Sequence, residues 1–227
     1  MKKVKFPPIF IISLKNSSRR EIIAKHLRSL NIDFEFFDAV YGKELSEEEL
    51  AKIDFDFYPK EHHSPKPLTL GEIGCAISHI KLYEHIVKNN IPEAIILEDD
   101  AIVPHNFEKI LLSALHKIPK KGDILFLFHG KAKVYPFMRN LPERYRLARY
   151  RTPSRKSKRT IIGGVGYFLT INGARKLLNI AYPIRMPADF LTGLLQNSGL
   201  IAYGIEPSCI FTGLLHSEID KIENRYD

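Results

Sequence analysis

The segment AIILEDD, residues 94–100, places a short apolar run directly before three consecutive carboxylates. Four apolar residues in succession are typical of a strand that is buried on both faces of a parallel sheet. In open α/β sheets, ligands bind beyond the carboxyl ends of the strands, which is where Glu98, Asp99 and Asp100 would lie. The segment therefore predicts a strand that carries acidic side chains to a binding edge.

Side chains alternate along an extended chain, so we expect Glu98 and Asp100 to point one way and Asp99 the other. Two carboxylates on one side can hold Mg²⁺ or Mn²⁺, which prefer oxygen ligands from carboxylates, water and substrate phosphates. A solvated acidic turn is the alternative interpretation of the same residues.

Strands and helices alternate on both sides of this segment. We predict strands at residues 9–14, 34–40, 94–97, 124–128, 161–170 and 200–205. We predict helices after Ser18 and Thr69, each of which stands three residues before a glutamate in capping-box spacing, and further helices at residues 106–118, around 174–178 and from 189 to about 199. This order predicts an α/β domain with a mostly parallel sheet.

Positive charge is concentrated in one part of the chain. Residues 131–159 hold eleven Lys or Arg against the single acid Glu143, a local balance of +10. The net charge of the whole chain is +8, so the remainder sums to −2. Residues 130–160 show no sustained periodicity and are predicted to form a long basic excursion without packed elements, suited to an anionic partner.

No run of about 18 apolar residues and no secretory signal pattern is found, so we expect a cytoplasmic protein. The cysteines, Cys75 and Cys209, lack the spacing of a zinc or redox motif, and two buried free thiols are the favoured interpretation.

Two further stretches could meet a phosphate. Arg19 and Arg20 lie at the predicted start of a helix, where free backbone N–H groups favour anions. In the helix after Thr69, Gly71, Gly74 and Ser78 form a stripe with almost no side chain, which either a neighbouring segment or a nucleotide could approach closely.

The order of four blocks resembles glycosyltransferase family 25, which includes bacterial lipooligosaccharide galactosyltransferases and collagen galactosyltransferases. The blocks are IISL at residues 11–14 with the Arg19–Arg20 pair, FFDAVYG at 36–42, LGEIGCAISH at 70–79 and ILEDD at 96–100. A weaker likeness continues through GY at 166–167 and GARKLL at 173–178. Many relatives carry Trp in the helix after Ser-His, where this chain has Tyr83, which loosens any inference about the acceptor.

This resemblance implies a GT-A fold, with a Rossmann-type nucleotide-binding sheet merged with an acceptor-binding half. In one continuous domain over residues 1–227, the nucleotide-sugar half would span about 1–128, the basic excursion 129–160 and the acceptor half 161–227. The implied reaction is an inverting, metal-assisted transfer of a hexose, most commonly galactose, from a UDP-sugar to a lipooligosaccharide core.

The resemblance also assigns roles to individual residues. Mn²⁺ (or Mg²⁺) would be held by Glu98 and Asp100, with His216 as a further metal or diphosphate contact. The donor would be bound by residues of the matching blocks, namely Ser13, Leu14, Arg19, Asp38, Ala39, Ser78, His79 and Asp99. Asp189, in a Pro-x-Asp sequence, is the candidate base that takes the proton of the acceptor hydroxyl, and N-capping of a helix is its alternative role.

We expect the basic excursion to hold a phosphorylated lipooligosaccharide core or to rest on the anionic inner membrane. Two other functions share some of these features. A metal-dependent phosphoesterase or nuclease also needs clustered carboxylates, although no second metal position can be assembled here. A non-catalytic nucleic-acid-binding protein would use the basic excursion alone. We favour the glycosyltransferase, with no nucleic-acid partner.

Overall fold

Helices and strands alternate along the chain much as the sequence pattern predicts. The computed structural model describes residues 6–62 and 66–213. In chain order the elements are β1 (Ile9–Ser13), α1 (Arg19–Ser29), β2 (Glu35–Asp38), η1 (Gly42–Glu44), α2 (Glu47–Leu50), α3 (Phe57–His62), α4 (Leu70–Lys88), β3 (Glu93–Glu98), β4 (Ala101–Ile102), α5 (Phe107–Lys117), β5 (Ile124–Phe126), β6 (Arg139–Asn140), η2 (Pro142–Arg144), β7 (Arg146–Arg149), β8 (Gly166–Thr170), α6 (Ile171–Ala181), α7 (Ala188–Gly193), α8 (Leu195–Ser198), β9 (Ala202–Glu206) and β10 (Phe211–Thr212).

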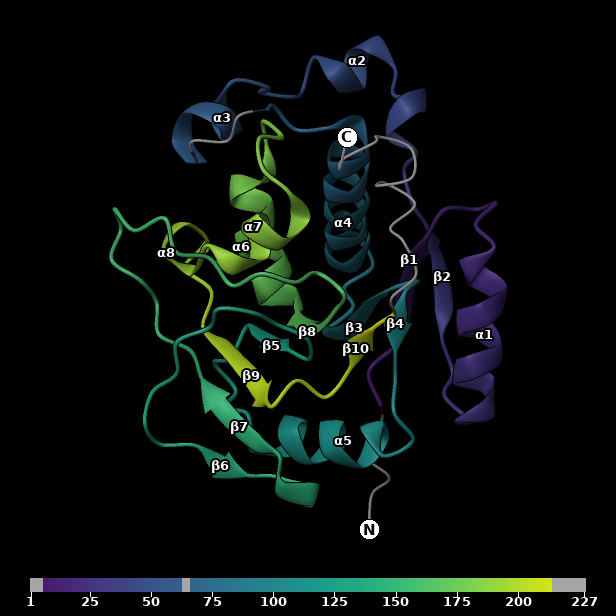
Figure 1. Cartoon of the computed structure of the whole chain (residues 1–227), viewed down its shortest axis with the longest axis vertical. Helices are drawn as coiled ribbons and strands as arrows, with labels where there is room; N and C mark the ends of the chain where they lie inside the picture. The colour runs from purple at the N-terminus through teal and green to yellow at the C-terminus, as the bar shows by residue number, and fades with distance from the viewer. Residues whose placement is uncertain (1–5, 63–65, 214–227) are drawn as a thin grey trace.

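Eight strands form one mixed sheet in the order β2-β1-β3-β8-β5-β9-β7-β6 (Figure 1). β1 runs parallel to β2 and β3, and β5 runs parallel to β9. The other four pairings are antiparallel, including both pairings of β8. The prediction of a mostly parallel sheet is therefore wrong, because an apolar run looks the same whichever way its neighbours point. Only the path of the connecting chain decides strand direction.

Helices cover both faces of the sheet and give the molecule three layers (Figure 1). α4, α6 and α7 pack on one face, whereas α1 and α5 pack on the other. The strand β1 contributes to both cores, since Phe10 and Ile12 face the first group of helices and Ile9 and Ile11 face the second. An uninterrupted apolar sequence in β1 follows from this double burial.

The basic excursion is more ordered than predicted. β7 pairs with β9 and extends the sheet, and β6 pairs with β7. Leu147, Ala148 and Tyr150 are buried in this part of the chain. The prediction that residues 130–160 carry no packed element is wrong for residues 139–150. The apolar pair in β7 lies between two arginines and is too short to give a sequence signal, so its burial depends on β9.

The two predicted capping boxes have different outcomes. The box at the start of α4 is confirmed, since Thr69 Oγ1 accepts from the Glu72 N–H at 3.2 Å and the Glu72 carboxylate accepts from the Thr69 N–H at 2.9 Å. α1 begins where predicted, but Ser18 has helical backbone angles and makes no side-chain cap. The Oγ of Ser17 accepts from the N–H of Arg19 at 3.2 Å instead.

The second half of the chain contains shorter elements than predicted. The strand expected at residues 161–170 is confined to β8, and the helix expected to end near Gly199 is divided into α7 and α8. Gly199 does end α8, with a φ of 65° that a side chain would disfavour. Within residues 6–62 and 66–213, no helix is long and apolar enough to cross a membrane.

Candidate active site

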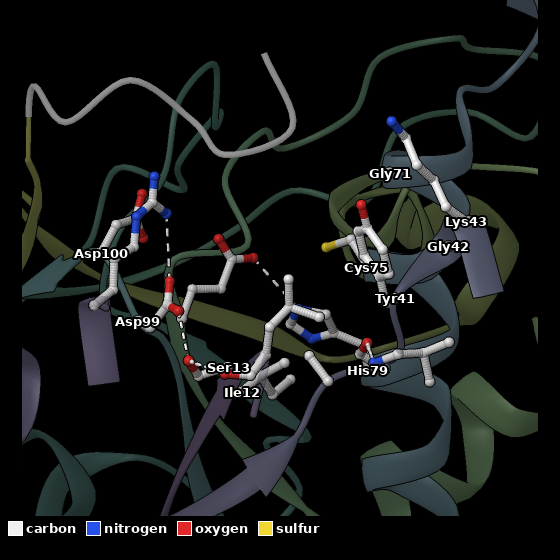
Figure 2. Close-up of a pocket in the computed structure, with 16 residues that line it drawn as sticks. Ile12, Ser13, Tyr41, Gly42, Lys43, Gly71, Cys75, His79, Asp99 and Asp100 are labelled. Atoms are coloured by element: carbon white, nitrogen blue, oxygen red, sulfur yellow. Dashed lines mark hydrogen bonds and ion pairs between the residues drawn. The ribbon is translucent and has the colours of Figure 1, made fainter. Parts of the chain in front are cut away.

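A pocket opens where β1 and β3 end, between the start of α1 and one side of α4 (Figure 2). β1 and β3 are parallel neighbours with Ile12 opposite Glu98, so the loops after both strands leave at the same edge of the sheet. Nine of the residues predicted from the sequence line this pocket: Ser13, Leu14, Arg19, Ala39, Ser78, His79, Glu98, Asp99 and Asp100. Two other predicted residues, Asp38 and Asp189, are not among the described residues that line it.

Asp99 ties the two loops together. Its carboxylate accepts hydrogen bonds from Ser13 Oγ at 2.6 Å and from Ser17 Oγ at 3.2 Å. It also forms an ion pair with Arg19, with 3.3 Å between Oδ1 and Nη1 (Figure 2). Asp99 therefore fixes the position of Arg19 at the N-terminus of α1, where an anion would be stabilised.

The three acidic residues follow the side-chain alternation of an extended strand only in part. β3 ends at Glu98, and Asp99 and Asp100 lie in a turn. Asp99 does point toward β1, away from its neighbour Asp100 (Figure 2). The turn takes the Asp100 carboxylate to Thr212 of β10, whose Oγ1 donates to Oδ2 at 2.9 Å.

The residues Glu98 and Asp100 fit the requirements of a divalent ion. Burial and then the negative charge of Glu98 raise the pKa of Asp100. No donor among residues 6–62 and 66–213 reaches the second carboxylate oxygen of Asp100, although that oxygen is buried. A cation would satisfy this oxygen and remove the repulsion between the two carboxylates.

Asp38 is oriented by Arg20 at the exposed end of β2. The guanidinium of Arg20 forms an ion pair with Asp38 and donates to the Ser13 carbonyl at 2.8 Å. It also lies over the ring of Phe36, 4.7 Å from the centroid. Arg20 therefore holds the ends of β1 and β2 together, while Arg19 lines the pocket.

The small-residue stripe of α4 receives a neighbouring segment of chain. A Cβ on Gly74 would lie 2.7 Å from the Val40 carbonyl oxygen, so the chain after β2 packs directly on the helix. Ser78 Oγ accepts from the Val40 N–H at 2.8 Å and donates to the Gly74 carbonyl at 2.6 Å. Of the two interpretations open from the sequence, close approach of a neighbouring segment holds at Gly74 and Ser78.

His79 occupies a buried position between α4 and the sheet. Its Nδ1 lies 2.7 Å from the hydroxyl of Tyr167, which lies 2.6 Å from the hydroxyl of Tyr83. Its Nε2 lies 3.3 Å from Oε1 of Glu98. Burial raises the pKa of both tyrosines, so both stay protonated and can serve as hydrogen-bond donors. This chain of contacts fixes the imidazole with Nε2 directed at the acidic cluster.

Asp189 lies near the acidic cluster, in the first turn of α7. It is half-buried, and its Oδ2 accepts from the N–H of Gly163 at 3.4 Å. Burial is the main cause that raises the pKa of Asp189, and the charge of Glu98 adds to it. The N-cap of α7 is Pro187, so helix capping does not explain Asp189. His216, the predicted further metal contact, lies outside the described residues.

Several pocket residues were missed from the sequence. Tyr41, Gly42 and Lys43 line the pocket because the chain after β2 crosses α4. Cys75 also lines it and is only partly buried, whereas Cys209 is fully buried as predicted; both thiols are free. The signal for Cys75 was its position one helical turn before His79, which places both on the same side of α4.

A second cavity lies between the basic excursion and helices α3, α7 and α8. It is lined by Phe57, Glu61, His62, Arg155, Lys156, Ser157, Lys158, Leu194 and Asn197. Lys158 forms an ion pair with Glu61 across it. Phe190, the neighbour of Asp189, packs against the ring of His62 at a centroid distance of 5.0 Å. Three basic side chains, Arg155, Lys156 and Lys158, thus line this cavity.

The family is established by comparison with known proteins. The model of glycosyltransferase family 25 (LPS biosynthesis protein) matches residues 6–192. The chain belongs to glycosyltransferase family 25. The matched region contains every predicted site residue except His216, and the acidic residues of this family 25 member lie at the edge where its β1 and β3 end.

The relatives of this family 25 member are larger proteins. Procollagen galactosyltransferase 1-B of Xenopus laevis is 33% identical over 201 residues, which cover 82% of this chain and 30% of that protein. Procollagen galactosyltransferase 2 of Homo sapiens is 28% identical over 214 residues, covering 88% and 32% respectively. The chain spans about a third of the length of these curated relatives. Among solved structures, a glycosyltransferase involved in the glycosylation of the major capsid of PBCV-1 matches with a TM-score of 0.33 and 11% identity. The match covers 77% of this chain and 66% of that one, and a TM-score of this size does not establish a shared fold.

Proposed function

We propose that the chain transfers galactose from UDP-galactose to a lipooligosaccharide core, with inversion at the sugar carbon and with Mn²⁺ (or Mg²⁺) as cofactor. The observation that carries the proposal is the meeting of Glu98, Asp99 and Asp100 with Arg19 at one pocket. Family 25 membership and the names of the relatives support glycosyl transfer and galactose. The arrangement is consistent with a GT-A architecture, in which donor and acceptor halves share one sheet.

The donor diphosphate fits between α1 and the acidic turn. Arg19, held by Asp99, supplies a fixed positive charge at the N-terminus of α1, the end at which the helix dipole favours an anion. Glu98 and Asp100 would hold the cation, whose chemistry is to neutralise the charge that develops on departing UDP. The residues after β2, including Ala39, form the opposite wall, where the nucleoside would lie.

Inversion requires a base on the far side of the sugar from the diphosphate. Asp189 is the candidate, because it is half-buried near Glu98 and its pKa is raised by burial. A carboxylate with a raised pKa takes a proton more readily than an exposed one. Asp189 would accept the proton of the acceptor hydroxyl as that oxygen attacks the sugar.

The second cavity suits an acceptor that carries phosphate. Arg155, Lys156 and Lys158 line it, and His62 of the same lining contacts Phe190, the neighbour of the candidate base. A phosphorylated core that contacts these side chains would place its sugars near Asp189. The same surface would favour peripheral contact of this otherwise cytoplasmic enzyme with an anionic inner membrane.

A panel of UDP-sugars tests the donor and the cofactor together. Mn²⁺ with UDP-galactose should raise the melting temperature and give slow donor hydrolysis, whereas UDP-galactose in EDTA should do neither. Asp100→Asn should lose the Mn²⁺-dependent part of the stabilisation. Equal stabilisation by UDP in EDTA would contradict the metal assignment, and an equal response to UDP-glucose would contradict the choice of galactose.

A further inference from the structure

Three side chains with different metal-ligand chemistry meet in the pocket. Cys75 and His79 are one turn apart on α4, and Glu98 ends β3 beside them. A sulfur, a ring nitrogen and a carboxylate oxygen from these residues all lie within 4.8 Å of one another. Figure 2 shows Cys75 and His79 on the same side of α4, facing the pocket.

The separation of His79 and Glu98 fits a tetrahedral site. Two ligands bound to Zn²⁺ at about 2.0–2.1 Å lie about 3.3–3.4 Å apart at a tetrahedral angle. The separation of His79 Nε2 and Glu98 Oε1 is 3.3 Å. A thiolate bound at about 2.3 Å lies about 3.6 Å from the other two ligands, and the Cys75 sulfur lies within 4.8 Å of both.

The surroundings of the cluster favour a cation. The second ring nitrogen of His79 lies 2.7 Å from the buried Tyr167 hydroxyl, a contact that orients the imidazole as outer partners orient metal-bound histidines. Burial and then the carboxylates of Glu98, Asp189 and Asp100 raise the pKa of the Cys75 thiol well above its ordinary value; the same carboxylates favour a cation beside the sulfur, and binding of Zn²⁺ would release the thiol proton. The pocket side remains open, so water or a substrate atom can complete the coordination.

We propose that Cys75, His79 and Glu98 form a binding site for Zn²⁺ that is separate from the Mn²⁺ position but shares Glu98 with it. Thiolate and imidazole ligands select Zn²⁺ or Co²⁺ over Mn²⁺ and Mg²⁺, which prefer oxygen. Zn²⁺ at this site withdraws Glu98 from the donor cation and inhibits donor use. That consequence rests on the proposed function, whereas the Zn²⁺ site itself does not.

Cobalt provides a direct spectroscopic test on the reduced full chain. One equivalent of Co²⁺ should produce the near-ultraviolet charge-transfer band of a cobalt–thiolate bond, and Zn²⁺ should remove it because Zn²⁺ binds more tightly. Cys75→Ser should lose the band, and Cys209→Ser, which changes the other thiol, should keep it. No band in the unmodified chain, or a band that persists in Cys75→Ser, would overturn the proposal.

A second measurement requires no variant. Alkylation of Cys75, followed by mass spectrometry, should slow by at least about tenfold when Zn²⁺ binds the thiolate. Excess Mn²⁺ should leave the rate unchanged, and the buried Cys209 serves as internal reference. An alkylation rate that Zn²⁺ does not alter would show that the thiol is not a ligand. Inactivity of the chain on UDP-galactose would contradict the proposed function. The cobalt band and the alkylation rate would still test the Zn²⁺ site, because neither measurement requires activity.

Discussion

At the residue scale, the adjacent glycines Gly163 and Gly164 contact the carboxylates of Asp189 and Glu98. A Cβ on Gly164 would lie 2.7 Å from Oε1 of Glu98, and the N–H of Gly163 donates to Asp189. Gly163 has a φ of 120°, a conformation that side chains disfavour. Because these two residues have no side chains, the carboxylates of Glu98 and Asp189 can both approach this loop.

Asp189→Asn should lower kcat by about 10²–10⁴-fold, the usual contribution of a general base. The amide keeps the size and the polar contacts of the side chain, so the Kd for UDP with Mn²⁺ should stay unchanged. Initial rates and isothermal titration with UDP measure the two quantities. A loss of less than about tenfold would show that another group accepts the proton.

The pH profile tests the same residue independently. Because burial raises the pKa of Asp189, its basic form is lost at a higher pH than for an exposed aspartate, whose pKa is about 3.9. The value of kcat/KM should therefore fall as the pH decreases through this raised pKa. Circular dichroism over the same range excludes unfolding, and an acid limb at or below the ordinary pKa would contradict the assignment.

At the element scale, α4 connects the cap at Thr69 to the pocket residues Cys75, Ser78 and His79. Thr69→Ala should lower the free energy of unfolding by about 1 kcal/mol, because it removes an acceptor from the first turn of the helix. Ser18→Ala is the matched control, since Ser18 stands in the same sequence pattern but makes no side-chain cap. Urea denaturation measures the free energy of unfolding of both variants. Equal losses would contradict the finding that Thr69 caps its helix and Ser18 does not.

Gly74 sets the distance between α4 and the chain after β2. Helix propensity alone predicts that Gly74→Ala stabilises the helix, by about 0.5–1 kcal/mol. The contact of the added Cβ with the Val40 carbonyl reverses the sign, and we expect a loss of about 1–3 kcal/mol with weaker UDP binding. In Gly130→Ala the nearest atom would be 3.8 Å away, so this control should leave both quantities unchanged. A more stable Gly74→Ala variant would refute the close packing.

At the scale of the whole molecule, the basic second cavity is linked to α7, the helix of the candidate base, by the contact of His62 with Phe190. Replacing Arg155, Lys156 and Lys158 together by serine should raise KM for a phosphorylated acceptor by at least about tenfold and flatten its dependence on salt. Donor hydrolysis should not change, because these residues lie outside the donor pocket. Lys120→Ser with Lys121→Ser removes exposed charge next to α5, on the other face of the sheet, and should affect neither measurement. Unchanged turnover in the triple variant would exclude this surface as the acceptor site.

Sequence by itself determined the elements whose signals are local. The apolar runs of β1 and β3, the capping box of α4 and the three acidic residues at the end of β3 depend on neighbours within a few positions, so each could be read directly. Nine of the predicted site residues lie together in one pocket, since most of them lie at or next to the end of a recognisable element and Ser78 and His79 lie within the helix predicted after Thr69.

Only the tertiary structure decided the features that depend on residues distant in the chain. The antiparallel direction of β8 and the pairing of β7 with β9 follow from how the chain returns to the sheet. The approach of the segment after β2 to Gly74 and the meeting of Cys75 with Glu98 depend on packing between α4 and the sheet. Hydrophobic patterning specifies which face of an element is buried but not what buries it, so these contacts had no sequence signal of their own.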